Sequence, residues 1–137
     1  VQKLEEVIEQ VAPDIVYTHH YGDLNLDHTL TYKAVMTACR PKPESKVNAI
    51  YGFEILSSTD WAGNPDEFFQ PNCFRVLSCN AMQAKMQALK CYASEIPAFP
   101  HARSERTVKA LAELRGAQVG RECAEAFRVI RLLQEMD

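Results

Sequence analysis

The chain has 137 residues, 47% of them hydrophobic and 24% charged, and its formal net charge is −3. A chain of about 150 residues buries roughly 70% of its unfolded surface, so we expect one globular domain over residues 1–137. The weak negative charge argues against nucleic acid and anionic membranes as partners, and no apolar run reaches the roughly 20 residues of a membrane-spanning helix.

The chain opens with a predicted helix and a predicted buried strand. Residues 1–12 carry apolar side chains at helical spacing, and Pro13 ends this pattern. Residues 14–18, DIVYT, form a nearly continuous apolar run, which is typical of a strand inside a parallel sheet. This pair is the second half of a β-α-β crossover, whose first strand is absent from the sequence. The helical pattern also begins at Val1 without a cap residue, so we expect that the beginning of the domain is missing.

The rest of the chain predicts further alternating elements. A helix is expected at about 27–39, with Asn25 or Asp27 as its cap. Its apolar face is expected to include Leu30, Val35, Met36 and Cys39. After it come predicted strands at 47–56 and 73–78, an irregular loop at 57–72, helices at 79–92 and 105–116, and a helix or a helix with a strand at 122–133. The alternation indicates a layered α/β domain with one incomplete edge.

The five cysteines favour a reducing compartment. Their number is odd, and no two stand in a C-x-x-C pair. Most fall on predicted helices and strands, where a free cysteine behaves as a small apolar residue. We therefore expect a cytoplasmic protein whose cysteines are structural, at positions 39, 73, 79, 91 and 123.

Residues 21–28, YGDLNLDH, follow the carboxyl end of the predicted strand at 14–18, where open α/β sheets bind their ligands. His28 is a candidate zinc ligand, and a neighbouring carboxylate such as Asp27 would fix its tautomer. The alternative is that Asp23, Asn25 and Asp27 are turn and cap residues and that His28 is simply exposed. Spacing alone leaves both interpretations open.

Two other stretches carry candidate site residues. In FPHARS, residues 99–104, His101 and Arg103 are placed to bind a polar substrate, although the stretch also reads as a loop before a helix capped by Ser104. His19 and His20 follow the strand at 14–18, and neighbours on an extended chain point in opposite directions. At most one of these two histidines is therefore expected to face the site.

Motifs for several other activities are absent. The sequence contains no Gly-rich phosphate loop, no G-x-S-x-G and no H-E-x-x-H. Its four histidines, at positions 19, 20, 28 and 101, would have to gather from separate loops to complete a zinc site. The residues by themselves offer one plausible ligand and too few partners for it.

Six stretches, taken in order, resemble the later part of proteins of the PIG-L/LmbE-like family. The members of this family are zinc-dependent deacetylases of N-acetylglucosamine-type sugars. The six stretches are GDLNLDH, YGFEILSSTDW, CFRVLS, LKCYASEI, FPHARS and RGAQVGRECAEAF, and the resemblance runs from about residue 1 to 133. It implies a Rossmann-like, three-layer α/β/α fold with a mostly parallel sheet. The His-Pro-Asp-Asp motif with which the family opens does not occur in this chain.

The family's H-x-D-H stretch falls on residues 25–28 of this chain. The resemblance makes His28 the third zinc ligand and Asp27 the carboxylate beside it. The family's first histidine, a charge-stabilising acid, is Asn25 here, so that role passes to His20, His19 or His101 while Asn25 donates a hydrogen bond to a developing oxyanion.

The other residues that are expected to have a role lie outside residues 25–28. The resemblance implies that His101 and Arg103 bind substrate, and Asp23 is expected to do so from the first loop. Arg115 and Glu125 match the RG…AEAF signature, which we interpret as mainly structural.

The implied mechanism needs groups that this chain lacks. The zinc lowers the pKa of a bound water and polarises the amide carbonyl, and an aspartate takes the proton. That aspartate and two of the three zinc ligands belong to the missing opening motif. We therefore expect a metal-dependent amide hydrolase of amino sugars of which these 137 residues form an inactive part.

Two alternatives to this hypothesis stay open. The chain is either an inactive carbohydrate-binding or assembly module of the same fold, or one half of a split enzyme. In each case we expect the sheet edge at 14–18 and the helix at 1–12 to be covered by a further copy of the chain or by a missing N-terminal segment.

Overall fold

A computed structural model describes residues 1–135 of the chain. The chain divides into two compact units, of which the first comprises Val1–Asn72 with the stretch from Phe127 onward and the second comprises Cys73–Ala126. The single domain expected over residues 1–137 stays a prediction. Among the described residues, no helix is long and apolar enough to cross a membrane.

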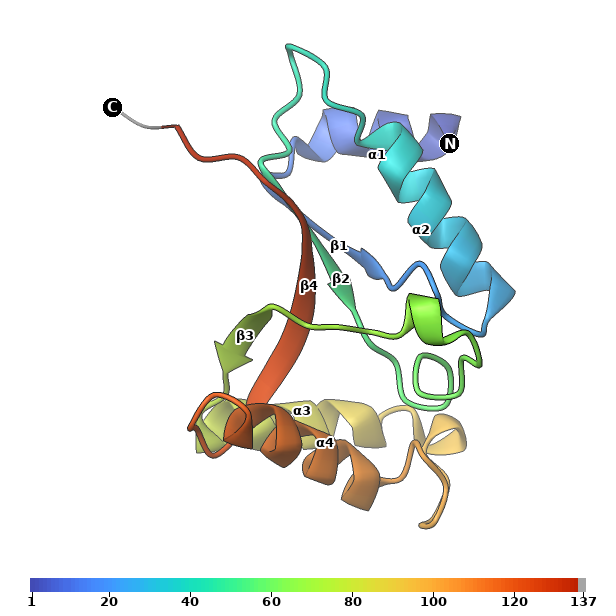
Figure 1. Cartoon of the computed structure of the whole chain (residues 1–137), viewed down its shortest axis with the longest axis vertical. Helices are drawn as coiled ribbons and strands as arrows, with labels where there is room; N and C mark the ends of the chain where they lie inside the picture. Colours follow the sequence, from blue (N-terminus) through green and yellow to red (C-terminus); the bar gives the residue numbers. More distant parts are fainter. Residues whose placement is uncertain (136–137) are drawn as a thin grey trace. The chain divides into compact units, whose positions relative to one another are not determined.

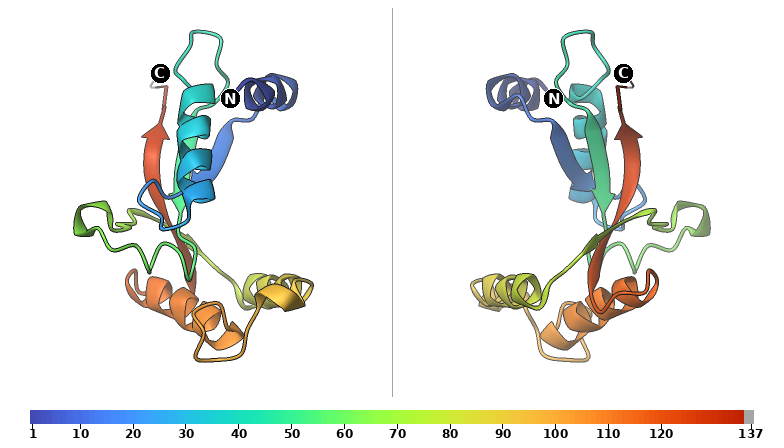
Figure 2. Two further views of the ribbon diagram at one scale, coloured as in Figure 1. Left: turned by 90° about the vertical axis from the view of Figure 1, so that its right-hand side faces the viewer. Right: turned by 90° about the vertical axis from the view of Figure 1, so that its left-hand side faces the viewer.

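In the first unit, two helices cover one face of the sheet (Figure 1, Figure 2). The helices are α1 (Gln2–Val11) and α2 (Leu26–Ala38), and the strands are β1 (Ile15–His19), β2 (Ala49–Phe53) and the part of β4 (Ala124–Leu132) that belongs to this unit. Strand β1 pairs in parallel with β2, and β2 pairs antiparallel with β4. A mixed α/β fold is confirmed, whereas the mostly parallel sheet is not, because β4 runs back along β2.

The core of this unit lies between the two helices and the sheet. Its buried members are Val35, Cys39, Val47 and Ile50, and partly buried apolar residues of α1, α2, β1 and β4 pack against them. Leu30 does not belong to this core, since it is 62% exposed, although it was expected on the same apolar face of α2 as Val35. Cys39 is the cap residue after α2 rather than a residue within it, yet only 1% of it is exposed.

In the second unit, two helices pack together beside the short strand β3. The elements are β3 (Cys73–Val76), α3 (Cys79–Lys90) and α4 (Glu105–Ala117). The helices begin where Ser78 and Ser104 accept hydrogen bonds from the backbone N–H groups of Ala81 and Thr107. Their shared core is made of Met82, Met86 and Ala112. In the sheet, β3 lies next to the start of β4.

The structure confirms the type of every predicted element except the last. The stretch at 122–133 was expected to begin as a helix, but residues 124–132 form β4. Its side chains are alternately buried and more exposed at first, because one face of β4 lies against the protein interior and the pairing with β2 fixes an extended backbone. Short apolar runs satisfy both the helical and the strand period, so the pairing decides between them.

Thr18 of β1 provides a test of this core. It is 1% exposed, and its hydroxyl oxygen is buried without a hydrogen-bond partner among the described residues. A buried hydroxyl without a partner costs about 1–3 kcal/mol. Thr18→Val keeps the side-chain shape, so we expect it to raise the free energy of unfolding by about 1 kcal/mol in urea denaturation.

Thr59→Val is the matched control, because the Thr59 hydroxyl is also buried but makes hydrogen bonds with both the Ile55 N–H and Asp23. We expect this variant to lower the free energy of unfolding by about 1–3 kcal/mol. Equal effects of the same sign in the two variants would contradict the prediction.

Candidate functional site

The loop after β1 is fixed against the segment around Glu67. His20 is 3% exposed, and its Nε2 lies 2.6 Å from the carbonyl oxygen of Glu67. At Gly22 a Cβ atom would lie 2.5 Å from both the Cβ and the carbonyl oxygen of Glu67, so only glycine fits there. The loop at the carboxyl end of β1 therefore holds the residues that follow it in a defined place.

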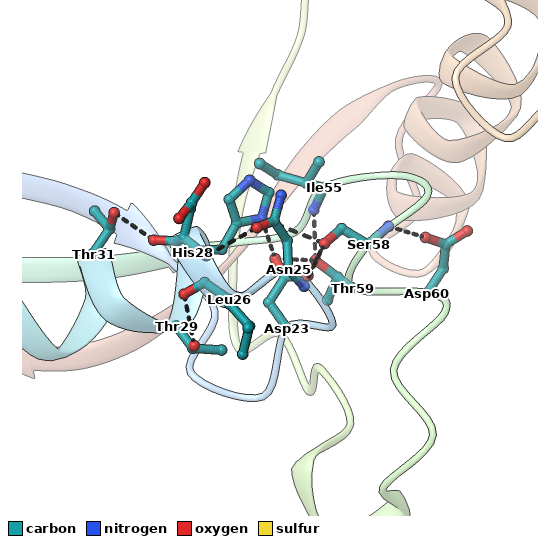
Figure 3. Close-up of polar contacts among 11 residues, drawn as sticks. Asp23, Asn25, Leu26, His28, Thr29, Thr31, Ile55, Ser58, Thr59 and Asp60 are labelled. Carbon is teal, nitrogen blue, oxygen red and sulfur yellow. Dashed lines mark hydrogen bonds and ion pairs between the residues drawn. The ribbon is translucent and has the colours of Figure 1, made fainter.

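Asp23 and His28 form the polar centre of this loop (Figure 3). The His28 Nδ1 atom lies 3.0 Å from Oδ2 of Asp23, whose side chain is 0% exposed. Two hydroxyl groups also donate to Asp23: that of Ser58 to Oδ1, and that of Thr59 to Oδ2 at 3.2 Å. Side chains that follow the ends of two neighbouring parallel strands thus meet around one buried carboxylate.

Asn25 and Asp27 open helix α2. The Asn25 side chain accepts a hydrogen bond of 2.9 Å from the backbone N–H of Asp27, which makes Asn25 the helix cap. Both side chains are exposed. The carboxylate that contacts His28 is Asp23, whereas the sequence had led us to expect Asp27 in that place.

His19 rather than His20 lies beside His28. The rings of His19 and His28 stack with their centroids 4.1 Å apart and an angle of 22° between the planes. Of the neighbouring histidines at 19 and 20, His19 contacts His28 and His20 contacts the Glu67 carbonyl oxygen. Burial lowers the pKa of His19, the nearby His28 lowers it further, and Asp23 opposes both effects. His19 is therefore held towards its neutral form.

The FPHARS loop belongs to the second unit. The backbone N–H of Arg103 donates to Nδ1 of His101 at 3.1 Å, so Nδ1 is an acceptor and a neutral His101 carries its proton on Nε2. The Arg103 guanidinium forms an ion pair of 2.7 Å with Glu95. A substrate anion at Arg103 would have to compete with this carboxylate.

The RG…AEAF signature makes structural contacts in the second unit. Glu125 pairs with Lys85 at 2.6 Å, and Arg115 donates to Gln118 at 3.1 Å. The first contact links α3 to the start of β4, and the second joins the last turn of α4 to its C-cap residue. They agree with the mainly structural interpretation.

The residues of this chain fit one position of a zinc site. Within residues 1–135, no three histidine, cysteine, aspartate or glutamate side chains converge as metal ligands would. His28 fits the chemistry of a single ligand, because Nδ1 faces Asp23 and Nε2 is the nitrogen left for a metal. The described residues do not fit a complete site.

Ser58 and Thr59 were missed by the sequence interpretation. They lie 30 or more residues after Asp23 and belong to a stretch that was predicted as an irregular loop. The available signal was their place shortly after β2, since the carboxyl ends of parallel neighbours meet at one edge of a sheet.

Known proteins resemble the chain in sequence and in fold. It is 32% identical over 99 residues to the uncharacterized deacetylase YaiS of Escherichia coli K12, and the match covers 69% of the chain and 47% of that protein. It superposes on N,N'-diacetylchitobiose deacetylase from Pyrococcus horikoshii with a TM-score of 0.68 and 17% identity, over 95% of the chain and 50% of the enzyme. The resemblance to PIG-L/LmbE-like deacetylases is confirmed.

A second deacetylase of known structure shares the fold. The zinc-inhibited form of teicoplanin deacetylase Orf2 superposes with a TM-score of 0.70 and 19% identity, over 98% of the chain and 51% of that protein. The chain spans about half the length of the relatives it matches. No protein-family profile matches the chain.

Proposed function

We propose that the chain is part of a metal-dependent hydrolase that removes an N-acetyl group from an amino sugar or sugar conjugate. The observation that carries this proposal is the His28–Asp23 pair, which leaves one imidazole nitrogen for a metal at the carboxyl end of β1. The names of the relatives support the reaction, since the curated relative and two of the superposed structures are called deacetylases.

Within this proposal, the chain's own residues take the following roles. His28 holds zinc through Nε2, and two further ligands come from outside this chain. A bound zinc would polarise the amide carbonyl and activate water. Asn25 and Asp27, at the exposed start of α2, face the reacting amide, and His101 and Arg103 contact the sugar. Asp23 contacts His28 rather than the substrate, and the Glu67 contact of His20 favours a structural role over an acid role.

A catalytically inactive module of the same fold, which binds carbohydrate or serves assembly, is the second candidate. The observation that favours it is the absence of three converging metal ligands among residues 1–135. A split enzyme whose other half supplies the ligands is a third form of the proposal, and it predicts activity only when both halves are mixed.

The first measurement is the intact mass of the protein isolated from its natural source, together with its zinc content. A mass well above 15.5 kDa and about one zinc per chain is expected for the hydrolase. Acetate release from N-acetylglucosamine and N,N'-diacetylchitobiose then tests the reaction, with and without a chelator.

His28→Ala is expected to lower acetate release by at least about 100-fold. Loss of a residue that only orients a metal ligand already costs about 10–100-fold in metal affinity or activity, so loss of the ligand itself should cost more. Lys33→Ala, an exposed position on the same helix, is the control and should keep the wild-type rate. Wild-type release by His28→Ala would exclude the metal role of His28. Sugar binding by the intact protein without acetate release would favour the binding module.

We also propose that a further copy of the chain or an N-terminal segment covers β1 and α1, and that the protein is cytoplasmic. Strand β1 is the edge of the described sheet, and Ile15 and Tyr17 on it are 45% and 47% exposed. All five cysteines are free in the structure. A stable monomer of this chain in light scattering would count against the covered edge.

A further inference from the structure

The buried carboxylate of Asp23 needs strong hydrogen bonds, because a carboxylate without partners is costly to remove from water. Its side chain is 0% exposed, and three donors surround it. Ser58 donates to Oδ1, while Thr59 at 3.2 Å and Nδ1 of His28 at 3.0 Å reach Oδ2. Figure 3 shows the three side chains converging on this carboxylate.

Backbone groups fix the direction in which both hydroxyls donate. The N–H of Asn25 donates to Oγ of Ser58 at 3.3 Å, and the N–H of Ile55 donates to Oγ1 of Thr59 at 2.7 Å. Each hydroxyl oxygen is thus an acceptor for a backbone group, and its single hydrogen is free to point to Asp23. The turn that carries Ser58 is held in addition by a 3.1 Å hydrogen bond from its N–H to Asp60.

The polarity of this network extends to His28. A carboxylate that receives hydrogen bonds on both oxygens is an acceptor only, so Nδ1 of His28 must be the donor. The neutral ring then carries its lone pair on Nε2. His19, stacked on the ring at 4.1 Å, holds the ring plane.

We propose that Asp23, oriented by Ser58 and Thr59, is the positioning residue that fixes His28 in the Nδ1–H tautomer and presents Nε2 as a ligand. The use of Nε2 for a metal rests on the proposed function, but the tautomer does not. Asp27, the carboxylate next to His28 in sequence, is exposed and does not take this role.

Nitrogen-15 NMR of the imidazole groups of the 137-residue chain tests the proposal without metal or substrate. At about pH 8 we expect the His28 ring to carry its proton on Nδ1, facing Asp23. A hydrogen bond to a charged group is expected to favour this tautomer by about tenfold or more. In Asp23→Ala the preference should be lost, and the Nε2–H form, the commoner one in free imidazole side chains, should dominate.

Asp27→Ala is the matched control and should leave the tautomer of His28 unchanged. A wild-type His28 that carries its proton on Nε2 would overturn the proposal, and this measurement needs no variant to fold. Retention of the Nδ1–H form in a folded Asp23→Ala chain, or its equal loss in Asp27→Ala, would also overturn it. Since no reaction is measured, a failure of acetate release leaves this result unaffected, and the reverse holds too.

Discussion

Gly116→Ala is expected to lower the free energy of unfolding by about 3 kcal/mol, at the upper end of the range for overpacked sites. A Cβ atom at this position would lie 2.6 Å from the carbonyl oxygen of Arg121, 2.6 Å from the amide nitrogen of Cys123 and 2.7 Å from its Cα. All three are backbone atoms, so no side chain can simply rotate away. The last turn of α4 would have to move off the chain that leads into β4.

A competing effect acts in the opposite direction but is smaller. Alanine is favoured over glycine within a helix by about 1 kcal/mol, and Gly116 lies within α4. The clash with backbone atoms should outweigh this gain. Urea denaturation followed by far-UV circular dichroism measures the balance, because α3 and α4 supply the helix of the second unit.

Gly63→Ala is the control for this comparison. Nothing lies within 4 Å of a Cβ atom at Gly63, so its free energy of unfolding should stay within about 0.5 kcal/mol of the wild-type value. A Gly116→Ala chain as stable as the wild type would show that the turn after α4 yields easily. The structural interpretation of the RG…AEAF signature would then rest on the Lys85–Glu125 and Arg115–Gln118 contacts alone.

Local patterns in the sequence were sufficient for most helices and strands. The apolar period and a stop signal predicted α1, and a hydroxyl or amide residue before the helix predicted the caps of α2 and α4. These signals act between residues a few positions apart, so one segment contains all the information that its conformation needs.

The predictions from sequence failed where contacts between residues far apart in the chain determine the structure. Strand β4 was expected to begin as a helix because its apolar spacing fits both periods, and only its pairing with β2 settles the conformation. The carboxylate partner of His28 was placed at the adjacent Asp27, whereas Asp23 is fixed for that contact by hydroxyls from residues 58 and 59. Sequence spacing carries no direct information about such long-range contacts.

The second large effect is expected at the centre of the first unit. Ile50 is 0% exposed and lies on β2, the strand between β1 and β4, where it belongs to the core of this unit. Ile50→Ala removes three carbon atoms from this core, and we expect the free energy of unfolding to fall by about 2–5 kcal/mol. The single tryptophan, Trp61, belongs to the first unit, so its fluorescence in urea reports the unfolding of that unit.

Leu30→Ala separates the observed core from the one that the sequence predicts. The helical pattern placed Leu30 on the apolar face of α2 together with Val35, but Leu30 is 62% exposed and Val35 only 6%. Loss of an exposed side chain leaves no cavity, so this variant should remain within about 0.5 kcal/mol of the wild type. A loss of about 2 kcal/mol or more at Leu30 would mean that α2 buries this face in solution. Because Leu30 lies two residues after His28, such a result would also place the candidate site beside a covering partner rather than at an open surface.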